Sequence, residues 1–527
     1  MTKPVLLGLS AMLACTHAAV DADAIDGRSL PGYNRPLPHM HYSGYIQTTL
    51  PGGKGDAHTH YWLVLADNVM AAPVVVWQQG GPGGSSLLGL LTENGPLTLN
   101  DASFAHNGTA PTVFDNPNGW HGENTMLYVE HPAPTGFSYC GSSGTDCVHD
   151  DETQAQLAYS FYVKFFELYP ELQRQPFYFT GESYAGVLVP TLSLKLLAAR
   201  TDANRHLAPW SVSGFALGND CPGNRVFTCT PYSGWAGTQV SLDFLAGHGM
   251  IPEAKKKQID AACASWYEEA PPGPYGPPPA DCRALLEDPI RPVKSIAGDT
   301  YDMGGGYFLY DTCGTDLSAL DSATSRPRQG VQPKPPQRSI ALAAYDRWAQ
   351  PKVQINADGA AETVSRLREG YPNTAGEYAC GQENAAVIWL NLPEVQEALH
   401  VKLVGKTEFS ISTGLHYNFT AYSLLDVYNS TLTKKLRIMQ FSGDADPCVP
   451  YVGTERWIES LHMKVSVPWR PWTAPNTMPV SGYVTTFDTS GGGFTFTTMR
   501  NAGHMVPRYK PKESKYMISK WLKGEKL

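Results

Sequence analysis

The sequence has few charged residues and no basic run. Charged side chains make up 17% of the 527 residues, and the formal net charge at pH 7 is −9. A protein that binds nucleic acid needs clustered lysine and arginine side chains, so we expect no nucleic-acid partner. Hydrophobic residues make up 42% of the chain, which indicates a globular protein with a large core.

Long apolar runs are also missing, apart from one short stretch at the N-terminus. Lys3 precedes that stretch, and small residues close it at Ala18 and Ala19. The stretch is too short for a membrane anchor, and the pattern is typical of a secretory signal peptide. We therefore predict a signal peptide over residues 1–19, no membrane span and entry into the secretory pathway.

The cysteine and histidine spacings of zinc sites do not occur, so the sequence predicts no metal and no cofactor. Cys15 belongs to the signal peptide, which leaves nine cysteines in the rest of the chain. An odd number leaves at least one thiol without an intramolecular partner. The candidate local disulfides are Cys140–Cys147, Cys221–Cys229 and Cys263–Cys282. The pairing of the remaining three stays open: Cys313, Cys380 and Cys448.

The most informative stretch spans residues 175–190 and reads QPFYFTGESYAGVLVP. An apolar, strand-like run leads to Ser183, and an apolar stretch with helical potential follows it. The flanking residues are small: Gly181, Ala185 and Gly186. A strand that turns sharply into a helix with a serine at the apex is a nucleophile elbow, and the helix directs its N-terminal amides at a developing anion. Taken alone, the pattern also fits an ordinary strand-to-helix turn.

A nucleophilic serine needs a base, and the base needs a carboxylate that orients it. Strand-like residues 436–441 end shortly before Asp444 and Asp446, and strand-like residues 494–499 end shortly before His504. Open α/β sheets place their sites past the carboxyl ends of strands, so these side chains stand where such a site would lie. The chain order serine, aspartate, histidine is that of the α/β-hydrolases.

A glycine-rich stretch, residues 80–84, follows a hydrophobic strand-like run at 72–78. Glycines allow the backbone to approach a bound group closely. A phosphate-binding loop is excluded because no Gly-Lys-Ser or Gly-Lys-Thr follows. The alternative is a surface loop, which the strand directly before it disfavours.

Three motifs, GESYAG at 181–186, GDAD at 443–446 and AGHMVP at 502–507, resemble in this order the serine carboxypeptidases, a branch of the α/β-hydrolases. Further elements agree with that family: VVVWQQGGPGGSS at 74–86, ENGP at 93–96, TGFSY at 135–139 and GN at 218–219. The similarity runs from about residue 30 to the C-terminus, with only proline-rich inserts unmatched.

The resemblance implies an α/β-hydrolase fold, with a central, mostly parallel sheet flanked by helices and a cap inserted over the active site. The implied order is a signal peptide at 1–19, a first core segment at 20–219, a cap insertion at 220–378 and a second core segment at 379–527. The proline-rich stretches 271–279 and 326–338 fall within the cap and predict exposed loops or spacers. The second stretch is also a candidate cleavage site, although an uncut linker fits it equally.

The matching motifs also assign roles. By resemblance, Ser183 is the nucleophile, His504 is the general base and Asp446 orients the imidazole. Asp444 is the structural alternative to Asp446. The backbone amides of Gly81 and Tyr184 would form the oxyanion hole.

The resemblance further implies a site for the free C-terminal carboxylate of a peptide, built from Gln79, Gly80, Glu93 and Glu182. Glutamine stands at 79 where the family most often has asparagine, and its longer side chain can still donate a hydrogen bond. Two carboxyl groups beside a substrate carboxylate cannot all be ionised, so at least one should be protonated. Because His504 must be neutral to act as base, we expect a compromise optimum at about pH 5.

These features predict a serine-type carboxypeptidase that acts on peptides with a free C-terminus, in a lysosome, a vacuole or outside the cell. Family resemblance also suggests a homodimer. Three alternatives stay open: an acyltransferase of similar sequence, an esterase, and a non-catalytic protective partner of lysosomal enzymes. Glu93 and Glu182 favour the peptidase, because an acyl-sugar donor has no carboxylate to bind. Sequons predict N-glycosylation at Asn107, Asn418 and Asn429.

Overall fold

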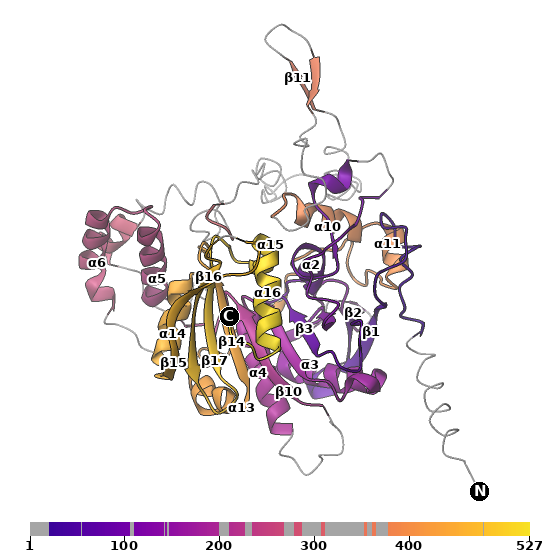
Figure 1. Cartoon of the computed structure of the whole chain (residues 1–527), viewed down its shortest axis with the longest axis horizontal. Coiled ribbons are helices and arrows are strands. Elements are labelled where there is room, and N and C mark those ends of the chain that lie inside the picture. Colours follow the sequence, from indigo (N-terminus) through magenta and orange to yellow (C-terminus); the bar gives the residue numbers. More distant parts are fainter. Residues whose placement is uncertain are drawn as a thin grey trace, which may run out of the picture.

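A twisted sheet runs through the centre of the molecule, and helices lie on both of its faces (Figure 1). The computed structural model describes residues 21–53, 55–105, 110–141, 143–144, 147–199, 210–226, 234–267, 279–286, 307–310, 352–355, 361–364, 378–477 and 479–527. The predicted signal peptide, Asn107 and the proline-rich stretch 326–338 lie outside these residues. So does the stretch 271–279, except for its last residue.

Six parallel strands form the middle of the sheet, and antiparallel strands flank them on both sides. The order is β1 (His41–Thr49), β2 (Asp56–Val64), β6 (Thr125–Val129), β3 (Val74–Gln78), β9 (Phe177–Glu182), β10 (Val212–Gly218), β14 (Arg437–Gly443), β17 (Phe494–Met499), β16 (Gly482–Asp488) and β15 (Lys464–Trp472). A short strand, β7 (Tyr139–Cys140), pairs with β2 beside this path. The prediction of a central, mostly parallel sheet is confirmed.

The other described elements surround this sheet. The helices are α2 (Ser86–Thr92), α3 (Asp151–Leu168), α4 (Ala185–Ala199), α5 (Gly234–Gly247), α6 (Glu253–Tyr267), α10 (Gln382–Leu390), α11 (Pro393–Ala398), α12 (Leu425–Val427), α13 (Thr433–Lys435), α14 (Tyr451–Ser460), α15 (Val506–Tyr509) and α16 (Pro511–Leu522). The short helical turns are η1 (Pro51–Gly53), η2 (Asp101–Phe104), η3 (Pro170–Leu172) and η7 (Tyr428–Leu432). The small strands are β4 (Leu97–Thr98), β5 (Phe114–Asp115), β8 (Val148–Asp150), β11 (Lys352–Ile355), β12 (Ala361–Val364) and β13 (His416–Asn418).

The two faces of the sheet bury separate hydrophobic cores. Successive side chains of a strand point to opposite faces, so Val75 and Trp77 enter one core while Val74 and Val76 enter the other. Helices α2, α10 and α16 supply apolar side chains to the first core, and α3, α4 and α14 supply the second. Strands covered on both faces need apolar residues throughout, which explains why β3, β6 and β9 are buried along their whole length.

Side-chain caps fix where two of the helices begin. Asp150 accepts hydrogen bonds from the amides of Glu152 and Thr153, and the Thr153 hydroxyl bonds the Asp150 amide in return. This reciprocal pair is a capping box, and it starts α3 at Asp151. Ser85 accepts a hydrogen bond from the Leu87 amide and so caps α2. Because Ser85 directly follows the glycine-rich stretch, its cap on α2 also fixes where that stretch ends.

Part of the predicted cap insertion forms α5 and α6, which lie together at one side of the sheet beside α14 (Figure 1). Arg456 of α14 bonds Asp243 of α5, and Lys256 of α6 contacts the same carboxylate at 2.7 Å. A disulfide between Cys263 and Cys282 ties α6 to residues 281–286. Among the described residues, no helix has the length and apolar character needed to cross a bilayer.

Candidate active site

Ser183 occupies a sharp turn between β9 and α4. Its φ angle is 60°, a left-handed conformation that a non-glycine residue adopts only under constraint. The Ser183 amide donates to the Gly218 carbonyl at 3.0 Å, and its carbonyl accepts from the amides of Gly186 at 3.0 Å and Cys221 at 3.1 Å. Ser183 is half-buried, and its hydroxyl bonds no other residue that the structure describes. This strand–turn–helix geometry is that of a nucleophile elbow.

Close packing explains the small residues around the turn. A Cβ atom on Gly181 would lie 2.2 Å from the Gln78 carbonyl oxygen and 2.9 Å from the Cβ atom of Ala185. A Cβ atom on Gly186 would lie 2.5 Å from the Cys221 backbone. Ala185 stands where the G-x-S-x-G pattern has its second glycine. Its methyl group fits because Gly181, which faces it, has no side chain.

His504 and Asp446 lie past the ends of β17 and β14, and they are bonded to each other. The His504 Nδ1 atom is 2.8 Å from Asp446 Oδ2, and both side chains are buried. Asp446 also accepts from the amides of Cys448 at 2.8 Å and Val449 at 3.1 Å. Because an ionised carboxylate only accepts hydrogen bonds, it places the imidazole proton on Nδ1 and leaves Nε2 as a proton acceptor.

Asp444, the alternative partner, is engaged elsewhere. Its Oδ1 atom accepts from the Asn501 amide at 2.6 Å, and its carbonyl oxygen lies 3.1 Å from Nε2 of His248. Burial raises its pKa, an effect that the hydrogen bond from Asn501 opposes. The structure therefore brings Asp446, and not Asp444, to the imidazole of His504.

The glycine-rich stretch packs directly against the serine turn. A Cβ atom on Gly80 would lie 2.6 Å from Ser183 Cβ and 2.7 Å from the Tyr184 nitrogen. Gly81 has a φ of 113°, which requires glycine. The amides of Gly80, Gly81 and Tyr184 donate to no residue in the described part of the chain. These N–H groups are therefore available to a ligand beside Ser183.

Gln79 has a fixed orientation in this loop. The indole N–H of Trp77 donates to Gln79 Oε1 at 2.7 Å. Since an indole nitrogen only donates, the oxygen of the amide must face Trp77 and the amino group must face the other way. That amino group donates to Glu182 Oε1 at 2.5 Å. Burial raises the pKa of Glu93, and a hydrogen bond from the Gln79 side chain to that acid opposes the rise.

Glu93 and Glu182 form a buried acidic pair, 2% and 1% exposed. Burial raises the pKa of Glu93 to about 8, against the lowering effect of the charge on Arg508. Burial also raises the pKa of Glu182 well above its usual value, and the charge of Glu93 adds to that rise. If both acids were ionised, both Glu93 oxygens and Glu182 Oε2 would be buried without a well-aligned donor, whereas a protonated Glu182 can hydrogen-bond Glu93. Buried oxygens in this state favour a protonated pair that can donate to a ligand.

Arg508 is a charged residue beside this pair that no predicted motif included. It is 9% exposed, it bonds Glu383 of α10, and its guanidinium lies 5.6 and 5.9 Å from the rings of Tyr378 and Tyr509. Arg508 comes directly after the AGHMVP motif in the sequence. This position is the only feature of the sequence that marks it as a candidate site residue. Sequence alone does not show which carboxylates it meets.

Tyr307 is a second residue that the sequence analysis missed. Its ring stacks on the His504 ring with centroids 4.7 Å apart and planes 19° apart. Its carbonyl oxygen accepts from the His504 amide at 2.6 Å. Tyr307 comes from the predicted cap insertion, where no motif marked it. It reaches the imidazole of His504 from outside the sheet.

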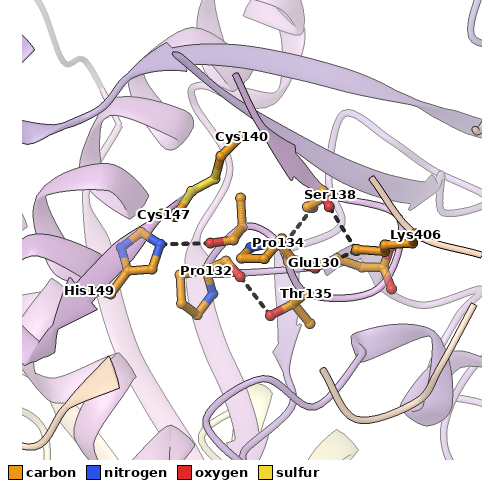
Figure 2. The surroundings of a disulfide bond; sticks show 10 residues. Glu130, Pro132, Pro134, Thr135, Ser138, Cys140, Cys147, His149 and Lys406 are labelled. Carbon is orange, nitrogen blue, oxygen red and sulfur yellow. Dashed lines mark hydrogen bonds between the residues drawn. A yellow bond between two sulfur atoms is a disulfide. The ribbon is translucent and has the colours of Figure 1, made fainter. Parts of the chain in front are cut away.

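Glu130 joins the glycine-rich stretch to the loop at residues 132–138. It is buried and accepts hydrogen bonds from the Ser85 hydroxyl, the Phe137 amide at 2.7 Å and His60 Nδ1 at 2.8 Å. Lys406 lies beside Glu130 in Figure 2 and donates to three carbonyl oxygens of the same loop. These contacts hold the TGFSY motif against the glycine-rich stretch.

Within the described ranges, one group of side chains has the spacing of metal ligands, and it is shown in Figure 2. The ligand atoms of Cys140, Cys147 and His149 lie within 4.8 Å of one another. Cys140 and Cys147 form the predicted disulfide, so neither sulfur is a thiolate that could bind a metal. The His149 Nε2 atom bonds the Ala133 carbonyl at 2.6 Å. This group stabilises the β7–β8 turn.

Several of the predicted disulfides and glycosylation sites fall on residues that the structure describes. The predicted Cys263–Cys282 disulfide is present, and Cys221 and Cys380 are also disulfide-bonded. Asn418 on β13 and Asn429 on η7 are exposed, as an attached glycan requires. The predicted partner Cys229 and the third sequon at Asn107 lie outside the described residues.

Known proteins share both the sequence pattern and the fold. The family model for serine carboxypeptidases matches residues 31–524. Serine carboxypeptidase 1 of Hordeum vulgare is 30% identical over 505 residues, which cover 94% of this chain and 92% of the relative. Serine carboxypeptidase-like 21 of Arabidopsis thaliana is 29% identical over 507 residues, covering 95% and 94%.

A solved structure supports the same fold. The prohormone-processing carboxypeptidase Kex1 of Saccharomyces cerevisiae superimposes with a TM-score of 0.62 at 17% identity, covering 96% of each chain. The shared architecture is that of the α/β-hydrolases, as predicted. The chain therefore belongs to the serine carboxypeptidase family, and it is a serine-type hydrolase of that family.

Proposed function

We propose that this protein removes single residues from the C-termini of peptides through an acyl-enzyme intermediate. Ser183 attacks the scissile carbonyl, and His504 takes the hydroxyl proton and later delivers it to the leaving amine. Asp446 holds the imidazole. The bond from His504 Nδ1 to the buried Asp446 supports these roles, because it leaves Nε2 free to accept the serine proton.

The amides of Gly81 and Tyr184 would receive the negative oxygen of the tetrahedral intermediate. Both N–H groups are without an acceptor among the described residues, and both belong to backbone that is fixed beside Ser183. Preorganised donors of this kind stabilise developing charge strongly, because they need no reorganisation during the reaction.

The observation that carries the proposal is the buried set of Gln79, Glu93 and Glu182. If both acids were ionised, three of their carboxyl oxygens would lack a well-aligned donor, so burial favours a protonated pair in which Glu182 can hydrogen-bond Glu93. Burying such groups costs stability unless a ligand satisfies them. A substrate carboxylate would accept hydrogen bonds from the protonated acids, from Gln79 and from the Gly80 amide. This complementarity selects peptides with a free C-terminus.

We expect activity to be highest at acidic to neutral pH. The pKa of Glu182 is also raised, so both acids of the pair keep their protons for the substrate carboxylate until the pH approaches the Glu93 pKa of about 8. Binding of free acids should weaken above it. At the acidic end kcat should fall, because only a neutral imidazole can take the serine proton.

Covalent labelling tests the role of Ser183 directly. A serine-directed phosphonate should label the protein once per chain, and mass spectrometry of the peptides should place the label on Ser183. Labelling at another serine, or none on the folded protein, would overturn the proposed nucleophile. A Ser183→Ala variant is the matched control, because it removes one oxygen atom from the turn.

An acyltransferase remains the second candidate, because it would use the same serine, histidine and aspartate. The two activities separate when a peptide acid is supplied together with an excess of a small alcohol. A peptidase releases the amino acid and mainly hydrolyses the acyl-enzyme, whereas a transferase passes the acyl group mainly to the alcohol. The buried acid pair, with the pKa of both members raised, favours the peptidase.

Location in the secretory pathway is also part of the proposal. The disulfides Cys140–Cys147 and Cys263–Cys282 indicate folding in an oxidising compartment, which agrees with the predicted signal peptide. N-terminal sequencing of the protein recovered from its natural source should find a start close to residue 19.

A further inference from the structure

Asp151, the first residue of α3, binds an unusual number of hydrogen-bond donors. Its carboxylate is 2% exposed. Oδ1 accepts from the hydroxyls of Tyr184 at 2.6 Å and Tyr417 at 2.8 Å. Oδ2 accepts from the backbone amides of Thr420 at 2.6 Å and Ala421 at 2.7 Å. The neighbouring acid Asp150 already caps the helix, so helix formation does not explain the side chain of Asp151.

One of these donors belongs to the residue that follows the nucleophile. The amide of Tyr184 is one of the two proposed oxyanion donors, and its phenol is anchored on Asp151. The rings of Tyr417 and Phe419 meet the Tyr184 ring at 5.9 and 5.6 Å, with planes 90° and 78° apart. Burial raises the pKa of the Tyr184 phenol, and the charge of Asp151 adds to that rise, so the phenol stays protonated and donates. The Tyr184 carbonyl accepts from the amides of Val187 at 2.9 Å and Leu188 at 3.2 Å, so Tyr184 is held at both its backbone and its side chain.

The other donors belong to a segment, residues 411–421, that also contacts the glycine-rich stretch. The Ser85 amide donates to the Ile411 carbonyl at 2.8 Å, and the Thr413 amide donates to the Gly83 carbonyl at 2.9 Å. One end of segment 411–421 thus braces the loop that carries Gly81. Its other end, at Thr420, is fixed on Asp151 together with Tyr184.

We propose that Asp151 is a positioning residue that sets the Tyr184 amide relative to the Gly81 amide, by holding Tyr184 and segment 411–421 on one carboxylate. This inference rests on the proposed function, since it takes these two amides as the oxyanion hole. An amide side chain cannot replace the carboxylate here, because its amino group would face donors at one of the two oxygen positions. The role of Asp151 is to fix geometry, and it does not contact the substrate.

The test compares Asp151→Asn with Asp150→Asn, measured as release of amino acid from an N-blocked dipeptide. Misplacing one oxyanion donor should lower kcat by about 10- to 100-fold, with KM within about twofold of wild type. The rate of labelling by a serine-directed phosphonate should fall by a similar factor, because its tetrahedral adduct uses the same amides. Asp150→Asn should leave kcat unchanged, because asparagine caps helices as well as aspartate does.

A double-mutant comparison separates positioning from a merely structural role. Tyr184→Phe removes the hydroxyl that donates to Asp151, so both substitutions break the same hydrogen bond. The double variant, Asp151→Asn with Tyr184→Phe, should therefore have a kcat no lower than that of the less active single variant. Multiplied losses, or a Tyr184→Phe variant with wild-type kcat, would overturn the inference. Tyr184→Phe alone decides the matter if Asp151→Asn does not fold. A wild-type protein without peptidase activity or label would instead refute the proposed function.

Discussion

The side-chain amino group of Gln79 lies 2.5 Å from Oε1 of Glu182, one residue before the serine turn. Trp77 fixes the amide in this orientation, so its donor faces the acidic pair. Gln79→Ala should raise KM for an N-blocked dipeptide acid by about tenfold, because one donor to the substrate carboxylate is lost. Steady-state kinetics at pH 5 measure this change.

The control for Gln79→Ala is the substrate itself. A dipeptide with an amidated C-terminus has no carboxylate to bind, so its slow hydrolysis should change little in the variant. Equal losses for acid and amide would mean that Gln79 supports the loop and does not contact the substrate carboxylate.

Stability should depend on pH through Glu93. Its folded-state pKa of about 8 lies above the ordinary value of 4.5, so its contribution to stability is fully present below pH 4.5 and is lost as the pH rises through 8. Thermal unfolding should therefore show a lower Tm at pH 8.5 than at pH 5, by several degrees.

Glu93→Gln should flatten this pH dependence, because glutamine does not ionise. Burial also raises the pKa of Asp220 to about 8 and that of Glu182 well above its usual value, so part of the dependence should persist in the variant. In the same variant KM for peptide acids should stop rising above about pH 8. A Tm profile identical to that of wild type would show that Glu93 is not protonated in the folded protein.

Two neighbouring aspartates should differ sharply on substitution. Asp446→Asn should lower kcat by about 10⁴-fold, because an amide no longer holds His504 in the required tautomer. Asp444→Asn should lower kcat by less than about tenfold, because its carboxylate bonds the Asn501 amide and not the imidazole. Circular dichroism confirms that both variants fold. The reverse order of losses would assign the orienting role to Asp444.

Gly80 should tolerate no side chain. A Cβ atom there would lie 2.6 Å from Ser183 Cβ and 2.7 Å from the Tyr184 nitrogen, so Gly80→Ala must displace the serine turn. We expect kcat to fall by about 100-fold or more. Gly247→Ala is the matched control, because a Cβ atom there meets nothing within 4 Å. Wild-type activity in Gly80→Ala would show that the loop can move away without cost.

Much of the fold could be predicted because local signals and global architecture agree. The strand-like runs that become β3, β9, β14 and β17 are almost entirely buried, and those of β3 and β9 begin with the continuous apolar stretch typical of such strands. Motifs at their carboxyl ends then mark the loops that converge at one edge of the sheet.

Contacts between distant segments could not be predicted. Arg508 and Glu383 meet only because α10 and α15 pack near each other in the folded chain. Asp151 reads as an ordinary acid at a helix start, and its binding of Tyr184 and Thr420 depends on tertiary structure. Tyr307 comes from the region where the sequence matched no motif. Sequence periodicity carries no information on such pairs.

The most direct measurement is the cleavage rate, between pH 4 and pH 8, of N-blocked dipeptide acids, which release a free amino acid, and of their C-terminal amides, which release an amino-acid amide. Wild-type protein should cleave the acids far faster than the amides, most rapidly in the acidic to neutral range, and Ser183→Ala should cleave neither. Equal rates on acids and amides, or undiminished release by Ser183→Ala, would contradict the account of Ser183 and the acidic pair.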